Sequence, residues 1–136
     1  MGIRFQECPC SGKSMKRNLA PWILLTVYKQ EGVYGYEINK ILQSRFEDLE
    51  FSLNMAGIYR HLKSMEQRGV LRTQWDTREP GPAKRRYYLT QDGKECLAYW
   101  LQTLRVHGQW IGRFLHEARK VFPVRADVET IGRKRS

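Results

Sequence analysis

Two groups of basic and polar side chains in this sequence have the types and spacing that suit contact with nucleic acid. The first group lies between Asn54 and Gln67, and at 100° per residue its Arg60 falls almost opposite the apolar side of a predicted helix. An arginine in that position could bind guanine through two hydrogen bonds, whereas the neighbouring polar side chains are better placed for phosphate or sugar. The second group flanks a turn-rich segment and would follow the sugar-phosphate backbone. The predicted DNA-binding residues are Asn54, Tyr59, Arg60, Lys63, Ser64, Gln67, Arg78, Lys84, Arg85 and Arg86.

The overall charge of the chain agrees with a polyanionic partner. Lysine and arginine number 24 against 14 aspartate and glutamate residues, which gives a formal net charge of +10. Charge alone does not distinguish nucleic acid from an anionic membrane or a ribosomal environment, and a single outward lysine or arginine is as often merely solvated. The two basic groups occur together on a helix and a hairpin, and this joint placement favours double-stranded DNA.

A pair of cysteines near the N-terminus could carry a different chemistry. Paired thiolates at Cys8 and Cys10 could hold a soft metal or form a reversible redox couple, and nearby lysines and an arginine would favour the thiolate. A metal site needs three or four ligands, which this chain completes only if a dimer brings two pairs together. We therefore expect no required cofactor, with Cys8 and Cys10 as the candidate metal or redox residues. Cys96 is expected to be a small buried apolar residue.

No arrangement of residues in the sequence indicates catalysis. We find no nucleophile with a plausible base, no paired carboxylates and no phosphate-cradling glycine loop. The segment Ser11-Gly-Lys-Ser14 lacks the upstream glycine of a P-loop and has no preceding strand. The sequence therefore predicts a binding protein and no enzyme.

The elements that must position the basic groups follow from the spacing of apolar residues. Helices are predicted from about Leu19 to Gln30 and from about Gly35 to Phe46, joined by a short linker from Glu31 to Gly35. A third helix is predicted from Asn54 to Gly69, with Ser52 or Asn54 as its cap and Gly69 as its terminator. Its predicted apolar stripe is Met55, Ile58, Leu62 and Met65.

After the third helix the pattern changes to the two-residue period of strands. Strands are predicted from Val70 to Trp75 and from Lys84 to Leu89, with a turn-rich tip from Asp76 to Ala83. Three short helices followed by such a hairpin is the element order of a winged helix-turn-helix. We therefore predict a mainly α-helical fold with a small β-hairpin, in which the third helix enters the major groove of DNA.

A long helix is predicted to follow, because no proline interrupts the segment between Thr90 and Pro123. Apolar residues recur there every three or four positions, close to a heptad seam, and a seam on so long a helix needs a partner. We expect this helix to form a homodimer. The residues predicted for the dimer face are Leu97, Trp100, Leu101, Leu104, His107, Trp110, Ile111 and Phe114.

The predicted organisation is one domain with appended elements. Residues 1–14 are expected to be a flexible arm, 15–90 the winged-helix domain, 91–122 the dimerisation helix and 123–136 a basic disordered tail. The longest apolar run, Trp22 to Val27, is far shorter than the ~20 residues of a membrane span. With no apolar leader at the N-terminus either, we expect a cytoplasmic protein.

The sequence resembles the PadR family of transcription regulators from about Met15 to Val121. One departure concerns Arg60, because family members often have proline after the tyrosine of the third helix. Position-specific contacts to DNA are therefore expected to differ from those of relatives. The motifs that carry the resemblance are Tyr34-Gly-Tyr-Glu-Ile38, Gly57-Ile-Tyr-Arg-His-Leu62, Met65-Glu-Gln-Arg-Gly-Val-Leu71, Trp75-Asp76, Gly81-Pro-Ala-Lys-Arg-Arg-Tyr-Tyr-Leu-Thr90 and Gly93.

The resemblance implies a two-fold dimer that binds near-palindromic promoter sites and represses until a small molecule releases it. It also implies that aromatic residues of the dimer face, Trp100 and Trp110 among them, could line a pocket for a small aromatic effector, although aromatics at helical spacing are more often plain dimer core. Two alternatives stay open. One is a thiol- or metal-responsive regulator acting through Cys8 and Cys10, and the other is a winged-helix protein-interaction adaptor.

Overall fold

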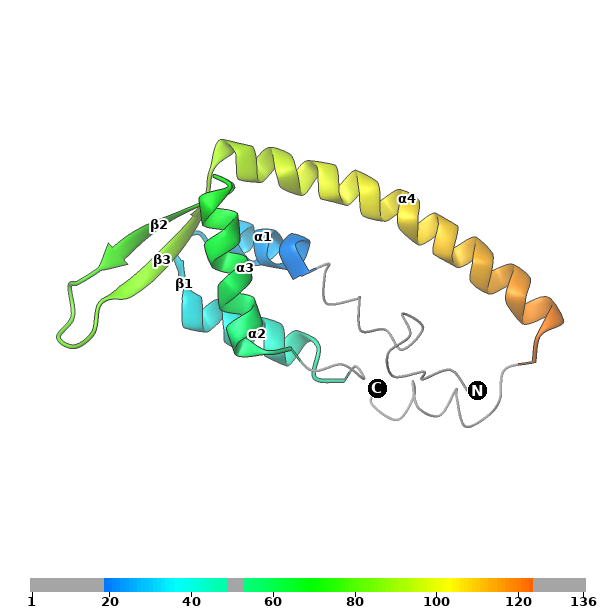
Figure 1. Cartoon of the computed structure of the whole chain (residues 1–136), viewed down its shortest axis with the longest axis horizontal. Coiled ribbons are helices and arrows are strands. Elements are labelled where there is room, and N and C mark those ends of the chain that lie inside the picture. Colours follow the sequence, from blue (N-terminus) through cyan, green and yellow to red (C-terminus); the bar gives the residue numbers. More distant parts are fainter. Residues whose placement is uncertain (1–18, 49–52, 124–136) are drawn as a thin grey trace, which may run out of the picture.

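The structure, a computed structural model, describes residues 19–48 and 53–123 (Figure 1). The predicted arm with Cys8 and Cys10, the alternative cap Ser52 and the predicted tail after Pro123 lie outside the described residues. The predicted fold class is confirmed: a mainly helical winged-helix domain carries a long C-terminal helix. The elements are α1 (Leu19–Lys29), β1 (Val33–Tyr34), α2 (Gly35–Arg45), α3 (Met55–Gln67), β2 (Leu71–Asp76), β3 (Lys84–Leu89) and α4 (Gln91–Val121).

Side-chain caps define the starts of α3 and α4, and a glycine follows the end of α3. Asn54 precedes α3, and its Oδ1 accepts a hydrogen bond from the Ala56 amide at 2.8 Å. Gly69 follows α3 with a φ of +82°, a conformation that suits glycine. The cap of α4 is Thr90, whose Oγ1 accepts from the Gly93 amide at 3.0 Å. The predicted cap and terminator of the third helix are thus confirmed.

The hydrophobic core lies where α1, α2 and α3 meet the sheet. The predicted stripe of α3 is correct for Ile58, Leu62 and Met65, which are all buried. It is wrong for Met55, which is 56% exposed because it is the first residue of α3 and lies beyond the edge of the core. Leu53 is buried just before the cap. The buried apolar residues of the core are Leu19, Ala20, Ile23, Leu24, Val27, Val33, Ile38, Leu42, Leu53, Ile58, Leu62, Met65, Leu71, Tyr87 and Leu89.

The sheet has a third strand that the sequence did not predict. Its order is β1-β3-β2 and both pairings are antiparallel. The expected linker between α1 and α2 contains β1, in which Val33 pairs with Tyr87 and Tyr34 pairs with Arg86. Two residues are too few to show the alternation by which strands are recognised in a sequence. This short strand fixes the hairpin to the helical part of the domain.

The helix α4 is anchored to the domain at its N-terminal end. Gly93 is buried, and Cys96, Leu97 and Trp100 pack partly against the core, so that Cys96 is half-buried as a small apolar residue. From residue 101 to residue 117 every side chain of α4 is exposed in this single protomer. Figure 1 shows the helix extending well beyond the rest of the domain. In the part of the chain that the structure describes, no helix is long and apolar enough to cross a membrane.

Candidate nucleic-acid interface

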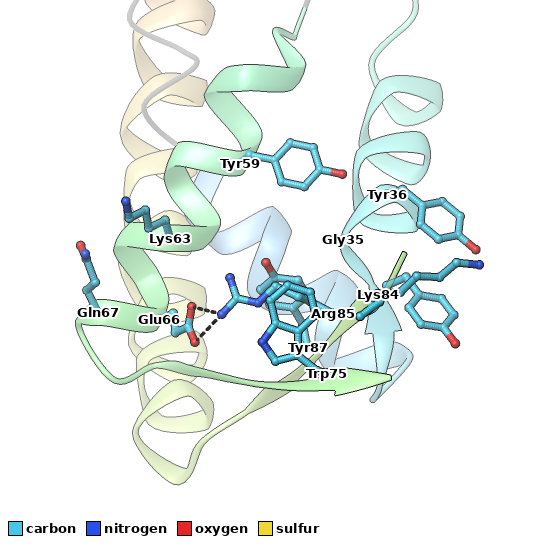
Figure 2. Close-up of a pocket in the computed structure, with 12 residues that line it drawn as sticks. Gly35, Tyr36, Tyr59, Lys63, Glu66, Gln67, Trp75, Lys84, Arg85 and Tyr87 are labelled. Atoms are coloured by element: carbon cyan, nitrogen blue, oxygen red, sulfur yellow. Dashed lines mark hydrogen bonds and ion pairs between the residues drawn. The ribbon is translucent and has the colours of Figure 1, made fainter. Parts of the chain in front are cut away.

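An open groove of about 620 Å³ separates α3 from the hairpin formed by β2 and β3 (Figure 2). The N-terminal end of α2 closes one side of it. Five of the predicted DNA-binding residues line this groove, together with several that were not predicted. The lining residues are Tyr34, Gly35, Tyr36, Tyr59, Lys63, Glu66, Gln67, Trp75, Ala83, Lys84, Arg85 and Tyr87.

The helix α3 presents two neighbouring faces to solvent. Tyr59, Lys63 and Gln67 recur at four-residue spacing and line the groove. Arg60 and Ser64 are also exposed, but they lie one step further around the helix and do not line it. The helix therefore offers one face toward the hairpin and an adjacent face, with Arg60, that is free of the groove.

The approach of α2 to this face depends on a glycine. A Cβ at Gly35 would lie only 3.2 Å from the Tyr59 ring and 3.3 Å from the Tyr87 ring. A larger residue there would push both rings away. Gly35 thus lets the start of α2 border the groove.

The arginine of the hairpin that faces α3 is paired with a carboxylate. Arg85 Nη2 donates to both carboxylate oxygens of Glu66, at 3.0 and 3.1 Å, and to Thr73 Oγ1 at 3.0 Å. The Thr73 hydroxyl in turn donates to Glu66 at 2.7 Å. The Arg85 guanidinium lies 5.1 Å from the centre of the Trp75 ring. Figure 2 shows Glu66, Arg85 and Trp75 close together between α3 and the hairpin, with Lys63 higher on α3 and Gln67 to the left of Glu66.

The second basic residue that the hairpin contributes to the groove, Lys84, lies over two aromatic rings. Tyr34 and Tyr36 stack at 5.5 Å with an interplanar angle of 11°, and Lys84 Nζ lies 5.5 and 5.6 Å from the two ring centres. Cation–π contact holds the lysine without neutralising it. Among the described residues Lys84 has no ion-pair partner, so its charge is available to an anion in the groove.

Two predicted DNA-binding arginines are directed elsewhere. Because successive side chains of a strand point to opposite faces, Arg86 lies on the face of β3 opposite to Arg85. Its guanidinium donates to Asp76 at 3.0 Å and to the Gly32 carbonyl at 2.9 Å. Arg78 at the tip of the hairpin also pairs with Asp76, at 2.9 Å, while its side chain stays 75% exposed. The structure thus does not bring Arg86 into the groove.

The carboxylate that holds these two arginines is strongly stabilised in its ionised form. The hydrogen bond from Arg78 lowers the pKa of Asp76 far below its usual range, and a hydrogen bond from the Tyr34 hydroxyl adds to this effect. The same hydrogen bond raises the pKa of Tyr34, because a phenol that donates to a carboxylate resists ionisation. Asp76 and Tyr34 therefore tie the base of the hairpin tip to β1.

Asn54 lies at the start of α3 and does not line the groove, and its side-chain oxygen accepts the hydrogen bond that caps the helix.

The described residues contain no group of three His, Cys, Asp or Glu side chains that could hold a metal.

The predicted dimer face of α4 divides into two parts. Leu97 and Trp100 pack partly against the core of their own domain, so they are not wholly available to a partner. The prediction overlooked this because the start of a long helix also has to cover the domain from which it emerges. The predicted residues that the structure leaves exposed are Leu101, Leu104, His107, Trp110, Ile111 and Phe114.

Sequence reasoning missed Glu66, Tyr36 and Trp75 as groove residues. A signal for one of them was present: Trp75 is directly opposite Arg85 in the antiparallel register, which follows once the hairpin is aligned. Glu66 was not predicted because it is negatively charged, whereas the charged residues predicted to bind DNA are all positive. Its role depends on the distance between α3 and the hairpin, which sequence does not reveal.

Comparisons with known proteins agree with this geometry. A model of the transcriptional regulator PadR-like family matches residues 24–99. A solved structure of a conserved protein of unknown function, described as a potential transcriptional factor, is similar to 78% of this chain and 91% of its own at 30% identity, with a TM-score of 0.66. No protein among the curated sequences matches.

Two further solved structures are similar over most of their length. A PadR family transcription regulator from Clostridium difficile is 26% identical, with 72% of this chain and 99% of its own covered and a TM-score of 0.60. A PadR-like transcriptional regulator from Bacillus cereus is 24% identical, with 76% and 96% covered and a TM-score of 0.63. The second of these supports the fold alone.

Proposed function

Because this chain belongs to the PadR-like family of transcriptional regulators, we propose that it binds specific sites in duplex DNA through α3 and the hairpin. The observation that carries this proposal is the groove between the two elements, which is lined by Lys63 and Lys84 and by exposed aromatic rings. A basic surface of this kind suits the phosphate backbone that flanks a helix lying in the major groove.

The two solvent faces of α3 suit different tasks in this arrangement. Arg60 reads a base edge, because it stands clear of the groove, is exposed and can offer two donors to guanine. The remaining predicted residues contact backbone and so set affinity more than specificity. They are Asn54, Tyr59, Lys63, Ser64, Gln67, Arg78, Lys84, Arg85 and Arg86, with Arg78, Arg85 and Arg86 limited by their ion pairs.

The active form in our proposal is a homodimer joined through α4. The helix leaves a row of large apolar side chains without a partner in the protomer, including Trp110 at 70% and Phe114 at 60% exposure. Exposed apolar surface of this extent typically marks an interface. A two-fold dimer would place two copies of α3 on successive major grooves, about 34 Å or a multiple apart.

We further propose repression that a small molecule or stress signal relieves. The support is the resemblance to the family together with the aromatic residues of α4, where His107 and Trp110 lie with ring centres 6.5 Å apart. A small aromatic molecule bound between the two α4 helices would change the spacing of the two α3 helices. Because binding to both half-sites requires one spacing, such a change would release DNA.

The experiment is selection of binding sites from a random duplex pool with the purified full chain, followed by affinity measurements at two salt concentrations. The expected result is a two-fold symmetric site. Arg60→Ala should cost ~1–3 kcal/mol per half-site and relax the preference at one base position. Lys63→Ala is the matched control on the same helix and should weaken binding to all sequences alike. Binding without sequence preference by the wild type would contradict the proposal.

A further inference from the structure

The basic residues of the hairpin differ in how far their charge is neutralised inside the protein. Arg78 and Arg86 share the carboxylate of Asp76, and Arg85 is paired with Glu66. Only the Arg85 pair borders the groove that runs between α3 and the hairpin. This location sets Glu66 apart, since it places a negative charge on the surface where a DNA strand would pass.

Glu66 competes with any other anion for the Nη2 end of the Arg85 guanidinium. The carboxylate receives two contacts from Arg85 Nη2 and one from Thr73, so a phosphate oxygen could reach that nitrogen only by displacing Glu66. Carboxylate and phosphate oxygens accept from guanidinium in the same geometry. Both side chains are only about one-third exposed, at 35% and 30%, so water screens the pair less than it would on an open surface.

We propose that Glu66 is a specificity-determining residue that withholds Arg85 from the DNA backbone. This inference rests on the proposed DNA binding. Non-specific affinity comes almost wholly from cations on phosphates, so neutralising one cation lowers it. Binding to the specific site also has the base contact of Arg60, which Glu66 does not reach. The carboxylate therefore increases the ratio of specific to non-specific affinity.

The test compares Glu66→Gln with the wild type in binding to two duplexes, the selected site and a random-sequence duplex, over a series of salt concentrations. The amide can still accept from Thr73 and Arg85 but carries no charge. We expect roughly tenfold tighter binding to the random duplex, a salt dependence steeper by about 0.9 per protomer, and a smaller gain on the selected site. Glu66→Ala should act in the same direction.

Glu79→Gln is the matched control. Glu79 lies at the tip of the hairpin, is exposed, and has no ion-pair partner among the described residues, so this variant makes the same change in net charge without releasing an arginine. A double-mutant cycle assigns the effect to the pair. In an Arg85→Gln background, Glu66→Gln should have no more effect than Glu79→Gln.

Three outcomes overturn the inference. If Glu66→Gln and Glu79→Gln behave alike, releasing Arg85 has no consequence. If Glu66→Gln binds more weakly with a shallower salt dependence while circular dichroism shows a folded protein, Glu66 acts by positioning the hairpin. If the wild type binds neither duplex, the proposed function fails and this inference fails with it.

Discussion

Substituting alanine for each of two glycines in α4 should change the stability of the protein in opposite directions. A Cβ at Gly93 would collide with the carbonyl oxygen of Val70, whereas a Cβ at Gly108 would meet no atom within 4 Å. In the middle of a helix, alanine is favoured over glycine by about 1 kcal/mol. Gly108→Ala should therefore stabilise the protein by up to that amount, and Gly93→Ala should destabilise it.

The loss of stability expected for Gly93→Ala depends on how firmly the Val70 carbonyl is held in place. The Val70 amide donates to the Met65 carbonyl at 3.0 Å, and the Val70 carbonyl accepts from the Thr90 amide at 3.2 Å. The obstacle is thus backbone fixed on both sides, so α4 must shift away from the domain. Such overpacking costs about 3 kcal/mol at the upper end of its usual range. The gain in helix propensity offsets at most about 1 kcal/mol of this cost, because Gly93 lies in the first turn of α4. The net loss of stability is therefore at least about 2 kcal/mol.

The assay is thermal unfolding of both variants and the wild type, followed by circular dichroism at one fixed protomer concentration, because the proposed dimer would make the midpoint depend on concentration. A loss of about 2 kcal/mol corresponds to a fall in Tm of roughly 7–9 °C for a chain of this length. A Gly93→Ala protein that melts at or above the wild-type temperature would refute the reasoning. A Gly108→Ala protein that melts lower would show that α4 packs closely against a partner at that residue.

Two further predictions concern the Asp76 cluster and the dimer. Because the pKa of Asp76 is lowered in the folded protein, its contribution to the free energy of unfolding is complete above the unfolded-state pKa of about 3.9 and is lost as pH falls toward the folded value. The urea midpoints of wild type and Asp76→Asn should therefore differ by a constant amount from pH 7 to 5, and this difference should shrink steadily as pH falls below about 4. A difference that stays constant from about pH 5 to pH 2 would contradict this. Phe114→Glu places a charge on the exposed apolar row of α4 and should shift the proposed dimer toward monomer, as measured by sedimentation equilibrium. Arg113→Glu, on the neighbouring face of the helix, serves as the control. Equal dimerisation of both variants would exclude this part of α4 from the interface.

The elements of this protein could be predicted from sequence because short-range interactions define them. The helical spacing of Ile58, Leu62 and Met65, the cap at Asn54 and the terminator at Gly69 all act within a few residues of one another. The alternation after Gly69 and the uninterrupted segment before Pro123 likewise predicted the hairpin and the long helix. Together these elements led to the winged-helix fold and to the two elements that carry the candidate interface.

The pairing of charges was decided only by the tertiary structure. Arg85 and Arg86 are adjacent in the sequence, yet strand alternation directs one to Glu66 and the other to Asp76. From the sequence alone both counted equally as DNA-binding cations. Which carboxylate each one meets depends on the hairpin register and on how closely α3 packs against it.

The same holds for residues whose burial depends on a distant neighbour. Val33 lies in a strand too short to recognise, and its partner Tyr87 is far along the chain. Leu97 and Trp100 belong to the apolar row of α4 but partly cover their own domain. Local sequence determined which side chains are apolar or charged and on which face of an element they lie. Contacts between residues far apart in the chain determined which of those faces remain free to bind.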